Sequence, residues 1–159
     1  MPYVRFNFVK KNMAKTTRIL IPSDFTVDSL DFVAQSIEES IADQLDIILV
    51  YGNKSSTSAS ELLDIGLEDQ LDALQSESFL EACKAIYQRY QNRKLSIFAD
   101  ILGTDNRNYL QHYLKGQSVD EVRIPSNYTY KRKTRNFFNV AHALLNIEGQ
   151  VCPSISFKS

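Results

Sequence analysis

The stretch Ile19-Leu20-Ile21-Pro22-Ser23-Asp24-Phe25-Thr26, residues 19–26, decides the fold of this chain. Its apolar run, closed by a proline, predicts a short buried strand over Arg18–Pro22. Thr26 can act as the N-cap of a helix whose inward positions recur at helical spacing. A strand that leads directly into a helix is typical of a parallel sheet. The inward positions of that helix are Leu30, Val33, Ala34, Ile37 and Ile41.

Strand-like and helix-like runs alternate along the rest of the chain, which predicts an open five-stranded parallel α/β sheet with helices on both faces. Further strands are expected at Asp46–Tyr51, Leu95–Leu102, Val119–Pro125 and Val151–Phe157. A serine-rich loop over 52–60 precedes a long helix that starts near Glu61, is interrupted near Gly66, and buries Leu67, Leu71, Leu74, Leu80, Cys83, Tyr87 and Tyr90. Asp105 is the expected cap of a short helix that ends at Gly116, and Arg135–Ile147 is the last helix, with Phe137, Ala141, Leu144 and Leu145 inward.

The first turn phrase has a near-copy: Ile21-Pro22-Ser23-Asp24-Phe25-Thr26 is matched by Ile124-Pro125-Ser126-Asn127-Tyr128-Thr129. Each phrase follows a predicted strand. Ligands of open parallel sheets bind at the carboxyl ends of two strands whose connections diverge. If the two strands are neighbours, the paired phrases form the mouth of such a site.

Length and composition indicate one ordinary globular domain. The 159 residues suffice for a core, and 43% of them are hydrophobic. A net charge of -1 provides no overall attraction to nucleic acid or to an anionic membrane. Two distant cysteines, Cys83 and Cys152, indicate reduced thiols in a cytoplasmic protein.

The N-terminal residues have no long apolar stretch, so we expect neither a signal peptide nor a membrane span. We treat residues 1–14 as an extension and residues 15–159 as the single domain. Val4, Phe6 and Phe8 alternate as in a short edge strand, so an ordered strand and a dispensable extension both remain open for this segment.

Five motifs, in this order, resemble the universal stress protein family, which has an adenine nucleotide alpha hydrolase-like fold. Residues 19–25 resemble its "ILVPTDF" opening, Leu45–Tyr51 its second strand, Gly103 its turn after the third, residues 120–124 its fourth strand, and residues 151–157 its closing "CPVLVV" strand. The resemblance implies the strand order 3-2-1-4-5, a stress-response role, and a homodimer formed through the strand Val151–Phe157. An apolar strand at a sheet edge also provides a physical reason to dimerise.

ATP-binding members of that family carry Gly-x2-Gly-x9-Gly-Ser/Thr after the fourth strand, because glycines let backbone N–H groups wrap phosphate oxygens. The corresponding positions here hold Pro125, Tyr128, Phe138 and Asn139. Proline lacks an N–H, and the two aromatic rings fill space that phosphates would need. We therefore expect no bound cofactor, with ATP or AMP as the alternative.

Two groups of residues could still hold a ligand. Asp24 and Val50 match family positions near the adenosine, although Asp24 could instead organise its turn through Asx hydrogen bonds, with Val50 in the core. The basic cluster Lys131, Arg132, Lys133 and Arg135 could place an anion at the start of the last helix, although a solvated loop that balances the acidic helix Glu61–Glu81 is the simpler interpretation. The full set of candidate crevice residues is Pro22, Ser23, Asp24, Val50, Ser126, Asn127, Lys131, Arg132, Lys133, Arg135 and Asn139.

No pattern in the sequence indicates catalysis or a metal site. His112 and His142 lack ligands at suitable spacing, and no Gly-x-Ser-x-Gly elbow surrounds a serine. We therefore expect a non-catalytic, cytoplasmic stress-response or regulatory protein that does not hold ATP in the family manner and does not bind nucleic acid or membranes. The alternative is a nucleotide- or anion-binding module that uses the basic loop 131–135.

Overall fold

The computed structural model describes residues 16–55, 66–151 and 153–159. They form one five-stranded sheet in the order β3-β2-β1-β4-β5, with every neighbouring pair parallel. The strands are β1 (Thr16–Pro22), β2 (Gln44–Gly52), β3 (Lys94–Leu102), β4 (Glu121–Arg123) and β5 (Ser156–Lys158). The predicted fold class and strand order are confirmed. Residues 1–14, predicted to be an extension, lie outside the described residues, as does most of the serine-rich loop.

The central strands β1 and β2 pair over seven positions, from Thr16 with Gln44 to Pro22 with Val50. Their apolar residues are buried on both faces, as the continuous hydrophobic runs predict. The strands β4 and β5 are shorter than predicted. The N–H of Ile124 donates to the Lys158 carbonyl, but Pro125 has no N–H with which to continue that ladder. A 3-10 turn, η1 (Glu148–Gln150), occupies the chain just before the segment predicted to start the last strand.

The two edges of the sheet differ in how their backbone groups are paired. At the β3 edge, the Tyr87 hydroxyl accepts from the Ile97 N–H at 2.6 Å, and the Asp100 carboxylate accepts from the Ile101 N–H at 2.8 Å. Side chains thus occupy donors that another strand would need. At the opposite edge, β5 has only three residues.

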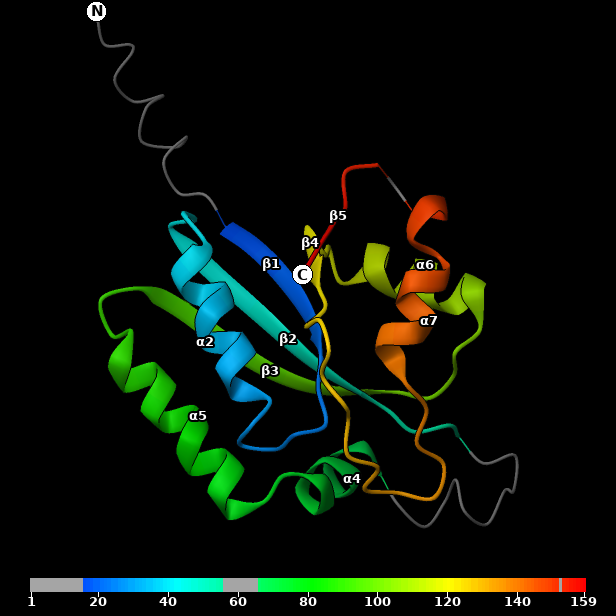
Figure 1. Cartoon of the computed structure of the whole chain (residues 1–159), viewed down its shortest axis with the longest axis horizontal. Coiled ribbons are helices and arrows are strands. Elements are labelled where there is room, and N and C mark those ends of the chain that lie inside the picture. Colours follow the sequence, from blue (N-terminus) through cyan, green and yellow to red (C-terminus); the bar gives the residue numbers. More distant parts are fainter. Residues whose placement is uncertain (1–15, 56–65, 152) are drawn as a thin grey trace, which may run out of the picture.

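One face of the sheet is covered by α2 (Leu30–Glu39) and α5 (Glu77–Arg89) (Figure 1). Helix α2 buries Leu30, Val33 and Ile37, as predicted. Ile41 is 91% exposed because the helix ends before it, so its predicted inward position is wrong. Thr26 is not the N-cap either: it begins a tight turn in which its carbonyl accepts from the Ser29 N–H at 3.1 Å, and the helix starts after Ser29.

The predicted long helix is two helices, α4 (Leu67–Leu74) and α5. The break falls at Ser76, whose hydroxyl caps the Phe79 N–H at 3.1 Å. The break resets the helical phase, so that Phe79 and Ile86 are buried in α5. Leu67, Leu80 and Tyr87 are exposed, contrary to prediction.

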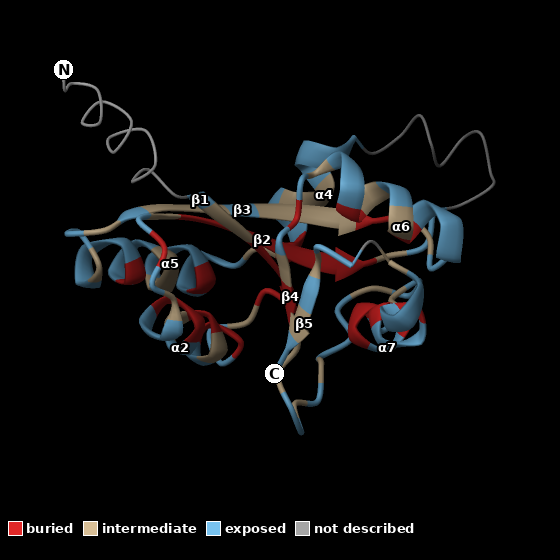
Figure 2. Cartoon of the chain, turned by 90° about the horizontal axis from the view of Figure 1, so that it is seen from above, coloured by how far each residue is buried: buried red, intermediate tan, exposed pale blue. Residues whose placement is uncertain are grey.

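The other face is covered by α6 (Arg107–Gly116) and α7 (Val140–Asn146); Figure 2 shows α7 and α2 on opposite sides of the β4–β5 pair. Asn106, not Asp105, caps α6; Asp105 instead forms an ion pair with Lys54 at 3.3 Å. Helix α7 starts five residues later than predicted, and Leu145 is 52% exposed rather than inward. The residues between β4 and α7 therefore form a long connection that crosses the carboxyl ends of the strands (Figure 1).

No helix within the described ranges is long and apolar enough to cross a membrane.

Candidate functional site

The two copies of the turn phrase face each other across the point where β1 and β4 diverge, as predicted. The Tyr128 hydroxyl, from the second copy, donates to the Asp24 carboxylate of the first at 2.8 Å from Oδ2. It also lies 3.0 Å from the hydroxyl oxygen of Thr26. The contact is made by the second copy's aromatic ring, so the two copies do not form two equal sides of an open mouth.

Asp24 is completely buried, and its carboxylate is fully engaged by the protein itself. Oδ1 accepts from the Thr26 hydroxyl at 2.6 Å and from the Thr26 N–H at 3.2 Å, which is the Asx-turn arrangement. Oδ2 accepts from the Lys131 N–H at 2.8 Å, in addition to Tyr128. A buried carboxylate is stable when its oxygens have such donors.

The turn after β1 has an unusual backbone. Phe25 has φ of 56°, in the left-handed region that bulky residues rarely adopt. Two features hold it there. The Ser23 hydroxyl accepts from the Phe25 N–H at 3.0 Å. The centroid of the Phe25 ring lies 5.6 Å from that of Phe79 and 5.9 Å from that of Tyr51. The side chain of Ser23, a predicted crevice residue, is thus used within the turn.

The connection from β4 to α7 is hydrogen-bonded to residues at the end of β2. The Lys133 N–H donates to the Tyr51 hydroxyl at 3.1 Å, and the Thr134 hydroxyl donates to the Asn53 amide oxygen at 2.7 Å. The Phe138 N–H donates to the Gly52 carbonyl at 3.1 Å. A Cβ on Gly52 would lie 2.5 Å from the Phe138 carbonyl, so this close approach requires glycine.

The basic cluster divides between the crevice and the solvent. The Lys133 ammonium reaches inward and donates to the carbonyls of Phe25 at 2.8 Å and Leu74 at 2.9 Å. Partial burial lowers the pKa of Lys133, although the Asp24 charge acts in the opposite direction. The Arg132 guanidinium donates to the Thr134 carbonyl at 3.2 Å and also to the Arg135 carbonyl. All four residues of the cluster are exposed, and of their side chains only those of Lys131 and Arg135 bond no backbone carbonyl among the described residues.

The predicted position of this cluster at the start of a helix is wrong. Helix α7 begins at Val140, and the Asn139 side chain caps it by accepting from the His142 N–H at 3.0 Å. Asn139 therefore serves the helix, and residues 131–135 do not directly precede it. Val50 is a fully buried core residue at the end of β2.

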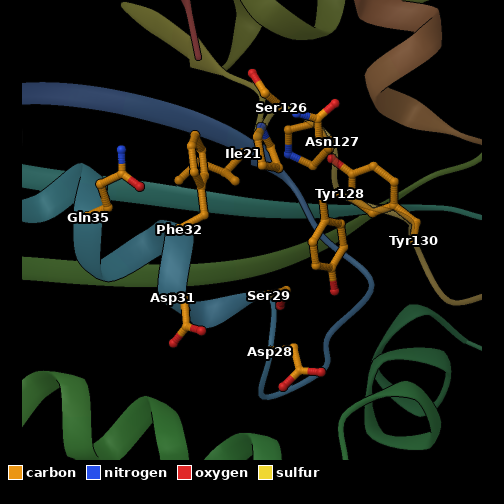
Figure 3. Close-up of a pocket in the computed structure, with 12 residues that line it drawn as sticks. Ile21, Asp28, Ser29, Asp31, Phe32, Gln35, Ser126, Asn127, Tyr128 and Tyr130 are labelled. Atoms are coloured by element: carbon orange, nitrogen blue, oxygen red, sulfur yellow. The ribbon is translucent and has the colours of Figure 1, made fainter.

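The other predicted residues border a cavity beside the crevice. Pro22, Ser126 and Asn127 line a cavity of about 360 Å³ between α2 and the chain after β4. Figure 3 shows Phe32 of α2 on one side of it and Tyr128 and Tyr130 on the other. Tyr128 therefore lies between the two spaces, covering Asp24 and lining the cavity.

Burial raises the pKa of both tyrosines. The pKa of Tyr128 is raised to about 12, mainly by burial and also by its bond to Asp24, while its bond to Thr26 acts in the opposite direction. The pKa of Tyr130 is raised by burial and then by the Asp24 charge. The Tyr130 hydroxyl is buried without a hydrogen-bond partner among the described residues, whereas the Tyr128 hydroxyl is fully engaged. The two rings meet edge to face at 4.9 Å.

Sequence reasoning missed the residues that organise this region, namely Tyr51, Thr134, Tyr130, Phe32 and Asp28. The tyrosines after β4 were available as a signal, because bulky aromatic residues in place of glycines must pack against something. The contacts made by Tyr51 and Thr134 span 83 residues of sequence and had no local pattern. Among the described residues, no group of three or more His, Cys, Asp or Glu side chains is arranged to hold a metal ion.

Comparison with known proteins finds relatives by structure alone. No family model matches the sequence, and no curated protein matches it. A universal stress protein family member from Burkholderia pseudomallei superimposes with a TM-score of 0.50 at 14% identity, covering 90% of this chain and 95% of that one. UspA from Lactobacillus plantarum superimposes with a TM-score of 0.48 at 16% identity, covering 91% of this chain and 98% of that one. A universal stress protein family protein from Arabidopsis thaliana with AMP bound has a TM-score of 0.44 at 13% identity, covering 89% of this chain and 91% of that one.

The Burkholderia likeness spans nearly the full length of both chains, and the strand order is the one that the resemblance to the family implied. At this level of identity the likeness concerns the fold. The chain therefore has the fold of the universal stress proteins, as a divergent form of it.

Proposed function

We propose that this protein is a universal stress protein-like regulatory protein of the cytoplasm, which acts without catalysis and without ATP held in the family manner. The observation that carries the proposal is the state of Asp24. Its carboxylate is at the position that would face an adenosine. It accepts hydrogen bonds from four groups of the protein instead: the N–H and hydroxyl of Thr26, the Tyr128 hydroxyl and the Lys131 N–H. A nucleotide would have to displace the Tyr128 hydroxyl and the Lys131 N–H from that buried carboxylate.

The positions of the missing glycines support the same proposal. Pro125 and Tyr128 line the neighbouring cavity, Phe138 packs against the end of β2, and Asn139 caps α7. Each of these residues thus has a structural use in this fold. A protein with this arrangement can act by presenting its surface to a partner, which is a non-catalytic role.

The alternative, an anion held by the basic loop 131–135, has weaker support. Lys133 and Arg132 direct their donors at backbone carbonyls, so among the described residues of the cluster only the charged groups of Lys131 and Arg135 bond no carbonyl. Two exposed cations without converging backbone N–H groups form a weak anion site.

Thermal unfolding of the full chain with millimolar Mg-ATP, compared with millimolar inorganic triphosphate, tests both ideas. A ligand present at a thousandfold excess over its Kd stabilises a protein by about 4 kcal/mol. We expect no such shift with either ligand. Stabilisation by ATP and not by triphosphate would contradict the proposal, and equal stabilisation by both, lost in Lys131→Met/Arg135→Met, would favour the basic-loop alternative.

We also propose a homodimer formed through the C-terminal strand β5. The strand lies at the edge of the sheet order, and an edge strand leaves backbone groups for a second chain. The opposite edge supports this choice, because its Ile97 and Ile101 amides are already bonded by side chains. Light scattering at micromolar concentration should give twice the mass of the chain; a monomer would contradict the proposal.

A further inference from the structure

The cavity between α2 and residues 125–130 has the lining of a cation site. We propose that it binds an ammonium or guanidinium group carried on a short apolar stem. Its volume of about 360 Å³ suits a small ligand or one long side chain. The proposal concerns a different space from the crevice over Asp24 and does not depend on whether that crevice admits a nucleotide.

The charges around the cavity all have one sign. Asp28 and Asp31 lie at its rim (Figure 3), both side chains are exposed, and neither forms an ion pair with a described residue. The lining contains no lysine, arginine or histidine. A cation entering here meets two carboxylates and no competing positive side chain.

The start of α2 does not offer the cavity an anion site. The backbone N–H groups of Ser29, Leu30 and Asp31 donate to the carbonyls of Thr26, Val27 and Asp28, at 3.1, 3.0 and 3.3 Å. The amides that usually bind phosphate at a helix start are therefore already bonded. Acidic residues in a first helical turn also stabilise the helix, but that role does not require a cavity beside them.

The walls provide a second, independent feature. Three rings surround the space: Phe32 from α2, and Tyr128 and Tyr130 from the connection after β4 (Figure 3). Aromatic faces attract ammonium and guanidinium groups and accommodate their apolar stems. The Tyr130 hydroxyl oxygen is itself buried, so Tyr130 contributes its ring, and not this oxygen, to the cavity wall.

Isothermal titration of the full chain with three probes tests the proposal. Agmatine represents a free guanidinium, the capped peptide Ac-Gly-Arg-Gly-NH2 represents an arginine of a partner protein, and the same peptide with citrulline removes the charge but keeps the shape. We expect at least one cationic probe to bind, with the citrulline peptide about tenfold weaker or undetectable. Agmatine alone would indicate a small-molecule ligand, and the arginine peptide alone would indicate a protein partner.

Two variants locate the binding. Asp28→Asn/Asp31→Asn should weaken the cationic probe about tenfold. The control Asp69→Asn/Asp72→Asn removes the same charge from exposed positions of α4 and should leave binding unchanged. Tyr130→Phe keeps the ring and should leave binding unchanged, whereas Tyr130→Leu removes the ring and should weaken binding; circular dichroism checks that both variants fold. Binding of neither cation, equal binding of the citrulline peptide, or equal loss in both double variants would overturn the proposal.

Discussion

The crevice over Asp24 and the cavity beside α2 share one wall, the Tyr128 side chain, yet they differ in almost every other respect. On the crevice side, a buried carboxylate has several internal donors, and the chain after β4 lies over it. On the cavity side, two aspartates and a buried tyrosine hydroxyl lack partners among the described residues. One side chain, that of Tyr128, can therefore close one space and form the wall of another.

The largest expected change in stability comes from replacing Asp24, the aspartate on the crevice side. Asp24→Ala leaves the Tyr128 hydroxyl, the Lys131 N–H and the Thr26 donors without their buried acceptor, and should lower the free energy of unfolding by about 4 kcal/mol. Urea unfolding followed by circular dichroism measures this loss.

The matched control is Asp28, an aspartate on the cavity side. Asp28→Ala changes an exposed carboxylate and should alter the free energy of unfolding by no more than about 0.5 kcal/mol. Equal losses in the two variants would mean that the two sides are not distinguished by their internal bonds.

The two tyrosines give a smaller and sharper test. Tyr128→Phe removes a hydroxyl that donates to a buried carboxylate, and should cost about 1.5 kcal/mol. Tyr130→Phe removes a buried hydroxyl with no partner among the described residues, and should leave the free energy of unfolding unchanged or raise it by up to about 1 kcal/mol. Chemical denaturation of both variants without added ligand measures the difference; a cost in Tyr130→Phe equal to that in Tyr128→Phe would contradict it.

Alkaline pH should weaken the contribution of the Tyr128 hydroxyl to stability. The folded-state pKa of Tyr128 is about 12, against the ordinary tyrosine value of 10.0, so the unfolded chain loses this proton first. The stabilisation is present in full below about pH 10 and is lost as the pH rises through about 12. The advantage of the parent chain over Tyr128→Phe should therefore narrow between pH 9 and pH 11. A constant difference in urea midpoints across that range would count against this account. The range from about pH 9 to about pH 11 includes the ordinary tyrosine pKa of 10.0, at which the unfolded chain loses the proton.

The fold was predictable because its signals are local. Consecutive apolar residues such as Ile47–Val50 predict a buried parallel strand without knowledge of its neighbours. Errors arose where a local signal competed with a second one. Ser76 caps a new helix inside an apparently continuous stripe, and Asn139 starts α7 later than its hydrophobic pattern indicated.

The site was predictable only in its location. Proline-terminated strands placed the two turn phrases at the switch point, and they do meet there. The pairing of Tyr51 with Thr134, or of Lys133 with the carbonyls of Phe25 and Leu74, depends on how a long connection folds back over the sheet. Such contacts follow from three-dimensional packing, which no spacing along the chain encodes.

The unequal edges of the sheet limit how the protein can assemble. A sheet with two free edges can add copies at both, and repeated addition gives a fibre. Here the Tyr87 hydroxyl and the Asp100 carboxylate already bond donors along β3, the longer edge. These two bonds disfavour backbone pairing at β3, and in the homodimer that we propose a two-fold axis would pair the β5 edges of both copies. In that homodimer, side chains on β3 would therefore set the end point of polymerisation.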